Sequence, residues 1–335
     1  MTFVRATAPG KLFLLGEYAA LEGAPALIAA VSQRAIVTAA EAEAWQLTAT
    51  GITVGTVELG PHGALPRALP EEVSRQLTLF DEVRKEVDGH FGGSGAPLRI
   101  VADSAAFQHG GNKLGLGSSA AIAVALAATL SKARGHDAEP DTVFRIADAA
   151  HRTAQGGTGS GGDIAASVHG GVILYRRDRE REVVALPSAL TVFAVATGTG
   201  SSTTELIGRV AQYQQNEPSS YRRDMESLVQ LSESIKDALS TADGTLSLAD
   251  RYFHAVATLA ENSGAPIVTE RHLEFRRLAA ASGAVFKPSG AGGGDLGLVF
   301  GKLESVDALQ STFTEAGALV IPVPTRSDGV RVEPE

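Results

Sequence analysis

Three glycine-rich segments, far apart in the sequence, carry the residues that could do chemistry. They occupy residues 9–18, 115–121 and 289–295. Glycines in such runs let backbone N–H groups approach an anion, because no Cβ stands in the way. Three of them in one acidic chain indicate a site that holds several phosphates at once, and this points to phosphoryl transfer.

The second segment, Gly-Leu-Gly-Ser-Ser from residue 115, opens a predicted alanine-rich helix over 118–133. A helix N-terminus offers unpaired N–H groups and a partial charge of about +0.5 e, so it suits the phosphates of a nucleotide. The serine hydroxyls can bond phosphate or Mg²⁺. The same run fits an ordinary loop with a serine N-cap. It also fits a dinucleotide fingerprint, which needs a strand before its first glycine, whereas residues 107–113 are interpreted as a loop.

A fourth glycine-rich loop, residues 156–163, ends in a carboxylate. Asp163 leads a predicted short helix over 164–168. Kinases commonly place an aspartate where it accepts or loosens the proton of a substrate hydroxyl. The alternative role for Asp163 is that of a helix N-cap.

Lys11 lies in an otherwise apolar predicted strand between two glycine-bearing turns. Such a lysine either extends along a strand edge to solvent or points into a polar site. Beside an aspartate it would keep that group ionised and would stabilise charge on a transferred phosphoryl group. The serine- and threonine-rich turn at 197–204 either binds an anion or caps a helix.

The elements that must position these residues divide near residue 185. Apolar or alternating runs predict strands at 2–7, 11–15, 26–31, 34–39, 45–50, 53–59, 98–101, 171–175 and 182–186. Helical spacing predicts helices over 69–91, 118–133 and 140–153. The charged run 176–181 is interpreted as a solvated hairpin turn.

The second half of the sequence changes character. It contains a strand at 190–196, a mostly helical stretch over 203–282, a helix near 304–316, and strands at 284–287, 296–300, 318–323 and 330–333. The expected fold class is α+β, with mixed sheets that carry helices on one face.

The composition narrows the class of protein. The chain of 335 residues has 29 basic against 38 acidic side chains, which argues against a general nucleic-acid binder. No cysteine is present, so disulfides and thiolate metal sites are excluded. The first ten residues lack the features of a signal peptide, and the longest apolar stretch, 120–130, is shorter than the ~20 residues of a membrane span. We expect a soluble, cytoplasmic protein that binds neither nucleic acid nor membrane.

Taken together, the segments resemble the motifs of the GHMP kinases, in the family's order, across residues 8–300. Pro9-Gly10-Lys11 through Gly16-Glu17 is similar to the first motif, residues 115–120 to the second, and residues 289–294 to the third. The resemblance implies a two-domain GHMP kinase fold. An N-terminal S5-like α/β domain would span 1–185 and a C-terminal ferredoxin-like α+β domain 186–335, with ATP and acceptor meeting between them.

Within this superfamily the chain looks most like the bacterial type of phosphomevalonate kinase. The details that carry this are Tyr18 after Gly16-Glu17, the loop at 150–163, the turn at 201–206, and Asp295 at the end of the third motif. The resemblance implies transfer of a phosphoryl group from ATP to 5-phosphomevalonate, giving 5-diphosphomevalonate in the mevalonate route to isoprenoids. The expected partners are ATP and this phosphorylated small molecule, in a monomer or homodimer.

Carried over position by position, the resemblance makes Lys11 and Asp163 the catalytic pair. The ATP-binding residues would be Gly115, Leu116, Gly117, Ser118, Ser119 and Ala120. The acceptor-binding residues would be Lys11, Tyr18, Ser160, Ser202, Ala291 and Gly292. Candidates for the acceptor's phosphate are Lys113, Arg152 and Lys287.

The cofactors implied are ATP and Mg²⁺. Mevalonate kinases have a magnesium-binding glutamate on the helix before the aspartate loop, where this chain has His151. The metal would then be held by Ser119, ATP oxygens and water.

Other functions fit the same residues. The chain could be a mevalonate kinase, or a GHMP kinase for another acceptor such as a sugar or homoserine. A homologue that only binds its ligand needs neither Lys11 nor Asp163, so the pair favours a catalyst. An NAD-binding oxidoreductase is the remaining alternative.

Overall fold

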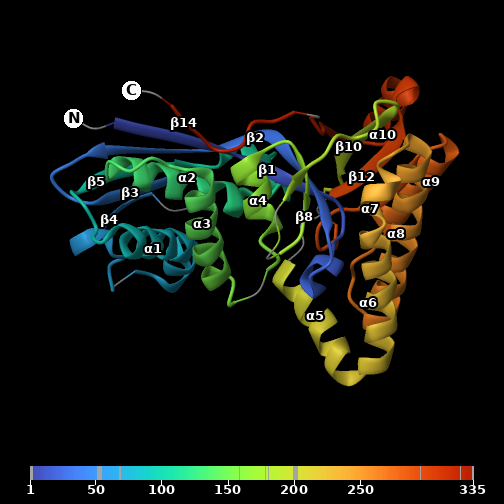
Figure 1. Cartoon of the computed structure of the whole chain (residues 1–335), viewed down its shortest axis with the longest axis horizontal. Coiled ribbons are helices and arrows are strands. Elements are labelled where there is room, and N and C mark those ends of the chain that lie inside the picture. Colours follow the sequence, from blue (N-terminus) through green and yellow to red (C-terminus); the bar gives the residue numbers. More distant parts are fainter. Residues whose placement is uncertain are drawn as a thin grey trace.

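The computed structural model describes residues 3–50, 55–67, 69–157, 159–177, 179, 181–198, 203–294, 296–324 and 326–333. Over these residues the chain forms an eight-stranded sheet, a four-stranded sheet and a two-stranded ribbon. Figure 1 places the large sheet and its helices at one end of the molecule and the long helices α6, α8 and α9 at the other.

The eight-stranded sheet belongs mainly to the first half of the sequence. Its main path runs β14-β1-β2-β5-β3-β4, and β8 pairs with β2 and with β9. Among the described strands, only β3 and β5 pair in parallel, so this sheet is mixed, which confirms the expectation. Its strands are β1 (Phe3–Leu15), β2 (Ala26–Glu41), β3 (Gln46–Thr50), β4 (Thr56–Glu58), β5 (Leu98–Asp103), β8 (Val172–Tyr175), β9 (Glu182–Val183) and β14 (Arg331–Glu333).

Four helices cover one face of this sheet (Figure 1). They are α1 (Glu71–Phe91), α2 (Ser118–Ala133), α3 (Pro140–Ala154) and α4 (Gly162–His169). α2 packs against β1 and β2 on one side and against α1 and α3 on the other. Its alanines suit this place, because a helix buried all round needs small apolar side chains to approach its neighbours closely.

The second half builds a smaller sheet under a set of helices. The order is β11-β12-β10-β13, and every described pair is antiparallel. The expectation of a mixed sheet is therefore wrong for this half of the chain. Its strands are β10 (Leu190–Ala196), β11 (Val285–Pro288), β12 (Leu296–Lys302) and β13 (Leu319–Pro322). The helices are α5 (Thr203–Asn216), α6 (Pro218–Glu233), α7 (Ile235–Ala238), α8 (Ala242–Ser263), α9 (Glu270–Ala281) and α10 (Val306–Glu315).

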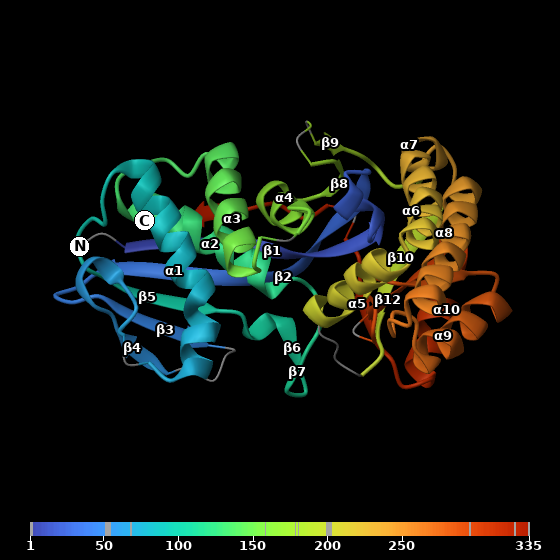
Figure 2. The ribbon, with the colours of Figure 1, turned by 90° about the horizontal axis from the view of Figure 1, so that it is seen from below.

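The short elements matter mostly as connections. The single-turn 3-10 helices are η1 (Ala19–Glu22), η2 (Pro61–Gly63), η3 (Ala105–Phe107) and η4 (Leu303–Ser305). Residues 107–113 are not a plain loop, because β6 (Gln108–His109) and β7 (Asn112–Lys113) form an antiparallel hairpin. Figure 2 shows this hairpin standing out from the edge of the molecule. Since β7 pairs with β6 alone, it is not the parallel strand that a dinucleotide fingerprint requires.

The two halves of the chain share a hydrophobic core. One buried cluster joins Leu12 and Leu27 of the large sheet to Leu296 of the small sheet and Tyr252 of α8. The strand expected at 330–333 pairs with β1, so the sequence end returns to the first sheet. The division into domains at residues 185 and 186 therefore stays a prediction. Among the described residues, no helix combines the length and the apolar character that crossing a membrane requires.

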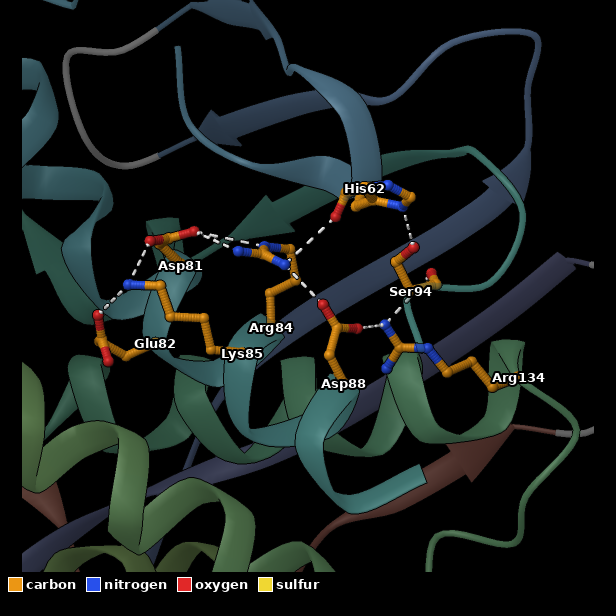
Figure 3. A network of polar contacts seen from close by, with 8 residues as sticks. All are labelled: His62, Asp81, Glu82, Arg84, Lys85, Asp88, Ser94 and Arg134. Atoms are coloured by element: carbon orange, nitrogen blue, oxygen red, sulfur yellow. Dashed lines mark hydrogen bonds and ion pairs between the residues drawn. The ribbon is translucent and has the colours of Figure 1, made fainter. Parts of the chain in front are cut away.

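An ionic network connects α1 to the C-terminal end of α2 (Figure 3). The glycine-rich loop lies at the opposite end of α2. The buried Arg84 of α1 donates to Asp81 at 2.9 Å and to Asp88 at 2.6 Å, and to the carbonyl oxygen of His62 at 3.3 Å. Asp88 also pairs with Arg134, which follows α2 directly. Partly buried pairs that share partners in this way are screened less by solvent than isolated surface pairs.

The last described segment braces the turn between α4 and β8. The amide of Val330 donates to the carbonyl of Val168 at 3.0 Å, and the amide of Gly171 donates to Ser327 at 2.7 Å. A Cβ at Gly329 would lie 2.0 Å from the oxygen of Val168, so only glycine permits this approach. Arg34 of β2 donates to the carbonyl of Gly329 at 2.6 Å. The C-terminal segment thus supports the helix that carries Asp163.

Candidate active site

Most of the residues predicted to bind ATP and acceptor meet in one cleft of about 640 Å³. The cleft lies between β1, the loop before α2, the loop before α4, the start of α5 and the turn after β11. The predicted residues that line it are Lys11, Tyr18, Gly115, Leu116, Gly117, Ser118, Ser119, Ser160, Asp163 and Ala291.

Two predicted residues do not line the cleft, and one lies outside the described residues. Ala120 is the third residue of α2 and is fully buried. A Cβ at Gly292 would lie 2.4 Å from the oxygen of Ile267, so Gly292 packs against that neighbouring segment. Ser202 is the residue that the structure does not describe.

The glycine-rich loop before α2 packs directly onto β1. The amide of Lys11 donates to the carbonyl of Leu116 at 2.8 Å. Gly117, in the left-handed region at φ 75°, caps the helix, so Ser118 is the first helical residue and no serine is the N-cap. A Cβ on Gly117 would lie 2.8 Å from Cε of Lys11. Ser118 and Ser119, whose amides lie in the first turn and lack partners within the helix, therefore line the cleft beside the lysine.

Asp163 sits in the first turn of α4 rather than at its N-cap. Gly161 is the N-cap, at φ 80°. The alternative role of Asp163 as the helix N-cap is therefore excluded, and Asp163 lines the cleft together with Lys11. Ser160 lies beside it, and the Ser160 hydroxyl accepts the amide of Gly162 at 3.3 Å.

Tyr18 joins the first and third glycine-rich segments. Its hydroxyl donates to the carbonyl of Ala291 at 2.7 Å. Burial raises the pKa of this hydroxyl, and the charge of Glu17 adds to the rise, so Tyr18 remains a donor. The backbone of Tyr18 has φ 61° and ψ −50°, a region that costs a non-glycine residue about 1–3 kcal/mol. Strain of this kind is retained where surrounding structure fixes a site.

Glu17 and Lys287 form a buried ion pair beside the cleft. Nζ of Lys287 lies 2.5 Å from Oε1 of Glu17 and also donates to the carbonyl of Pro288 at 2.6 Å. Lys287 is 0% exposed and Glu17 4%. Burial lowers the pKa of Lys287, and the charge of Glu17 offsets part of that effect. The prediction that Lys287 could meet the acceptor's phosphate is wrong, because its ammonium group is buried against Glu17.

The cations that face the cleft are two lysines. Lys11 and Lys113 are the Lys or Arg residues that line it within the described part of the chain. Lys113 ends the hairpin before the glycine-rich loop and is exposed. Arg152, the other candidate for the acceptor's phosphate, does not line the cleft and pairs with Asp148 at 2.5 Å.

Ser119 and His151 lie together at the start of α2. The hydroxyl of Ser119 and Nε2 of the buried His151 are 3.1 Å apart. No group of three or more His, Cys, Asp or Glu side chains among the described residues could hold a metal. Mg²⁺ is commonly bound by one or two protein oxygens plus substrate phosphates. The hydroxyl of Ser119 and the carboxylate of Asp163, which line one cleft, fit that pattern.

Sequence reasoning missed part of the lining. Phe107 and Asn112 come from the hairpin region before the loop, and their closeness in sequence to Gly115 was the available signal. Ile207 comes from α5, and nothing in its local sequence indicates a site. Lys113, named above as a candidate for the acceptor's phosphate, does line the cleft. The remaining lining residues, which were not named as binding residues, are Phe13, Glu17, Ala20, Leu21, Gln155, Gly159, Thr203 and Gly290.

Comparison with known proteins gives a family match and full-length relatives. Residues 79–171 match the model of the GHMP kinases N terminal domain. The chain is 29% identical to a phosphomevalonate kinase of Streptomyces sp. (strain CL190), over 96% of this chain and 97% of the relative. It is 28% identical to a mevalonate kinase of Aeropyrum pernix, over 98% of each.

Solved structures agree in fold. A Lin0012 protein from Listeria innocua is 25% identical with a TM-score of 0.87, over 99% of both chains. Streptococcus pneumoniae phosphomevalonate kinase, solved with phosphomevalonate and AMPPNP, is 21% identical with a TM-score of 0.74, over 96% of this chain and 98% of the other. The fold is thus one used by small-molecule kinases. With its N-terminal domain match over residues 79–171 and the three glycine-rich motifs in place, the chain is similar to the GHMP kinases.

Proposed function

We propose that this protein transfers the γ-phosphoryl group of ATP to the phosphate of 5-phosphomevalonate, giving 5-diphosphomevalonate and ADP. The observation that carries the proposal is the meeting of Lys11, Asp163 and the N-terminus of α2 in one cleft. A helix N-terminus binds phosphate, and a lysine and an aspartate at the same place are the groups that phosphoryl transfer uses.

The acceptor is proposed from chemistry and from likeness. Two lysine side chains, Lys11 and Lys113, line the cleft. Their positive charges would offset the negative charge of an acceptor that carries its own phosphate. The Streptomyces relative, matched over nearly its whole length, is a phosphomevalonate kinase. The Streptococcus pneumoniae enzyme, which shares the fold, binds phosphomevalonate and AMPPNP.

In the proposed reaction, an oxygen of the acceptor's phosphate attacks the γ-phosphorus of ATP. The bond from that phosphorus to the β–γ bridging oxygen breaks, and ADP leaves with the electron pair. The second pKa of a phosphate monoester is near 6, so at neutral pH the attacking oxygen is mostly deprotonated. Asp163 then acts by orienting Lys11 or the acceptor rather than by accepting a proton.

The remaining residues position the reactants. The first-turn amides of α2 would hold the phosphates of ATP, and Lys11 would stabilise charge that builds on the transferred group. Mg²⁺, which enters with ATP, would neutralise phosphate charge, with Ser119 as its protein ligand. Tyr18 and Ser160 line the same cleft and would contact the acceptor.

The decisive experiment measures ADP release from Mg-ATP with 5-phosphomevalonate and with mevalonate in parallel. Turnover with the phosphorylated acceptor alone supports the proposal. Asp163→Asn should abolish most of that turnover, whereas Lys236→Ala, at an exposed ion pair with Glu182, should leave it intact. Release of ADP that no acceptor stimulates, or no release at all, would contradict it.

A second candidate is a mevalonate kinase. It is favoured by the full-length likeness to the Aeropyrum pernix enzyme and by Asp163, because a hydroxyl acceptor needs a nearby carboxylate more than a phosphate does. Turnover with mevalonate alone would select this candidate and would leave the proposed ATP site unchanged.

A further inference from the structure

The loop that ends at Asp163 is held by side chains that do not themselves line the cleft. The main-chain carbonyl of Ser160 accepts two hydrogen bonds, from the hydroxyl of Tyr175 at 3.1 Å and from Nε of Arg177 at 3.1 Å. Oδ1 of Asp148, on α3, lies 3.7 Å from Nη2 of Arg177. Ser160 and Asp163 line the cleft, whereas these three neighbours lie behind the loop.

The loop backbone packs tightly against the same three side chains. Gly161 has φ 80°, and a Cβ there would lie 2.7 Å from Oδ1 of Asp148 and 2.9 Å from the hydroxyl of Tyr175. Nη2 of Arg177 would be 3.3 Å away. A glycine is required both by the backbone conformation and by this close approach. The loop therefore has little freedom to shift while these side chains keep their places.

The side chains that hold the loop are mostly buried, so solvent screens their contacts less than it screens surface contacts. The side chain of Asp148 is 16% exposed and that of Arg177 is 25% exposed. Asp148 also pairs with Arg152 at 2.5 Å, so one mostly buried carboxylate orders two guanidinium groups. An arginine can donate to a carbonyl and contact a carboxylate at once, because its five N–H groups form a rigid fork.

The interpretation of 176–181 as a merely solvated turn is therefore incomplete. Three of the four described arginines of this turn contact other elements. Arg176 pairs with Glu233 at the end of α6, and Arg181 lies 3.6 Å from Asp141 of α3. Arg177 alone among them reaches the loop before α4.

We propose that Arg177 and Asp148 are positioning residues for phosphoryl transfer. They fix the carbonyl of Ser160, and through it the loop that directs Asp163 into the cleft. The inference rests on the proposed function for its catalytic consequence, but the holding of the loop can be measured without any turnover.

The first test is hydrogen–deuterium exchange of the peptide that covers residues 155–165. Arg177→Met should raise the exchange rate of this peptide by about 10-fold, because lost contacts lower the free energy of local opening. Arg181→Met is the matched control, since it removes an equal charge from the same turn without touching the loop. Equal exchange in both variants and wild type would overturn the proposal.

The second test is kinetic. Arg177→Met should lower kcat by about 10–10²-fold, the scale of a small misplacement in an active site, while the KM for ATP stays within about 2-fold. Arg177→Lys should recover only part of kcat, because lysine lacks the fork that serves carbonyl and carboxylate together. Faster exchange of the loop with unchanged kcat would also overturn the proposal.

A milder variant protects the test against misfolding. Tyr175→Phe removes one of the two donors to Ser160 and keeps the ring, so it should fold and should show the same changes at smaller size. If the wild-type protein turns over neither acceptor, the proposed function fails. The exchange measurement still decides whether Arg177 holds the loop.

Discussion

Lys287 and Glu17 are 270 residues apart in sequence, yet Nζ of Lys287 lies 2.5 Å from Oε1 of Glu17 in a region closed to solvent. Glu17 belongs to the first glycine-rich segment, and Lys287 stands just before the third. The hydroxyl of Tyr252, on α8, donates to the carbonyl of Glu17 at 2.8 Å. One buried charge pair therefore connects two motifs that line the cleft from different halves of the chain.

Removing one member of this pair should be costly. We expect Lys287→Met to lower the free energy of unfolding by about 3–5 kcal/mol, because it leaves a carboxylate buried without its partner. The double variant Glu17→Gln/Lys287→Met should cost less than the sum of the single changes, because the two side chains are in contact. Urea unfolding measures both.

The control for that prediction is Lys236→Met. Lys236 and Glu182 are 64% and 48% exposed, and such a surface pair contributes at most about 1 kcal/mol. A Lys287→Met variant no less stable than Lys236→Met would contradict the role given to the buried pair.

Stability should fall in mild acid because of His272. Burial, with a smaller contribution from the charge of Lys287, lowers the pKa of His272 to about 4. In the unfolded chain the pKa of this imidazole is near 6.5. Between pH 6.5 and 4 the unfolded chain therefore binds more protons than the folded protein, so the free energy of unfolding decreases as the pH falls. This difference in pKa corresponds to a loss of about 3 kcal/mol in the free energy of unfolding.

The imidazole also caps α9, since the amide of Thr269 donates to Nδ1 of His272 at 3.2 Å, which requires that nitrogen unprotonated. Chemical denaturation at a series of pH values gives the free energy of unfolding at each pH. This free energy should change less steeply with pH for His272→Gln than for wild type. His254→Gln, at an exposed position, controls for loss of an imidazole. A wild-type slope in His272→Gln would rule the explanation out.

Gly10 should tolerate no side chain. A Cβ there would lie 2.4 Å from the oxygen of Leu116 and 2.5 Å from Cε1 of Phe107. Gly10→Ala should push the loop before α2 away from β1, lowering stability by about 1–3 kcal/mol and reducing ATP binding. Gly89→Ala, in α1 with open space around it, should instead add about 0.5–1 kcal/mol. Melting temperatures of the two variants should move in opposite directions.

The proposed catalytic pair, Lys11 and Asp163, should differ from binding residues in the kinetic constants that its substitution changes. Lys11→Ala should reduce kcat by about 10²–10³-fold, the scale of one lost transition-state contact. Asp163→Ala should also cause a large loss, and near wild-type turnover would show its assignment to be wrong. An unchanged kcat with a raised KM would make Lys11 a ground-state binding residue. Steady-state kinetics with both substrates varied measures this.

Local sequence predicts some elements closely and others poorly, for physical reasons. The alanine-rich α2 and the apolar β10 have the predicted bounds. In contrast, β1 runs through Pro9 and Gly10, where the sequence suggests a break. The register shift between Pro9 and Lys11 accommodates them, and the long partner strand β2 decides the outcome. Tertiary pairing thus overrides local propensity.

In the candidate site, too, local sequence identifies some residues, and others depend on contacts between distant parts of the chain. Residues next to a glycine motif, such as Ser119 and Asp163, could be identified because the motif itself creates the anion-binding backbone. The environment of Lys287 could not, since its burial depends on a partner from the other half of the chain. The role proposed for Arg177 was hidden for a related reason, because a charged run looks solvated until the fold places a loop against it.

The bracing of α4 by residues 327–330 has a consequence for synthesis on the ribosome. Val168, at the end of the helix that carries Asp163, receives its hydrogen bond from Val330, which is translated 162 residues later than Val168. The nascent chain can build α2 and its glycine-rich loop early, but the support beneath Asp163 must wait for the last strand. Until then α4 would rest on β1, α2 and α3 without the hydrogen bond at its C-terminal end.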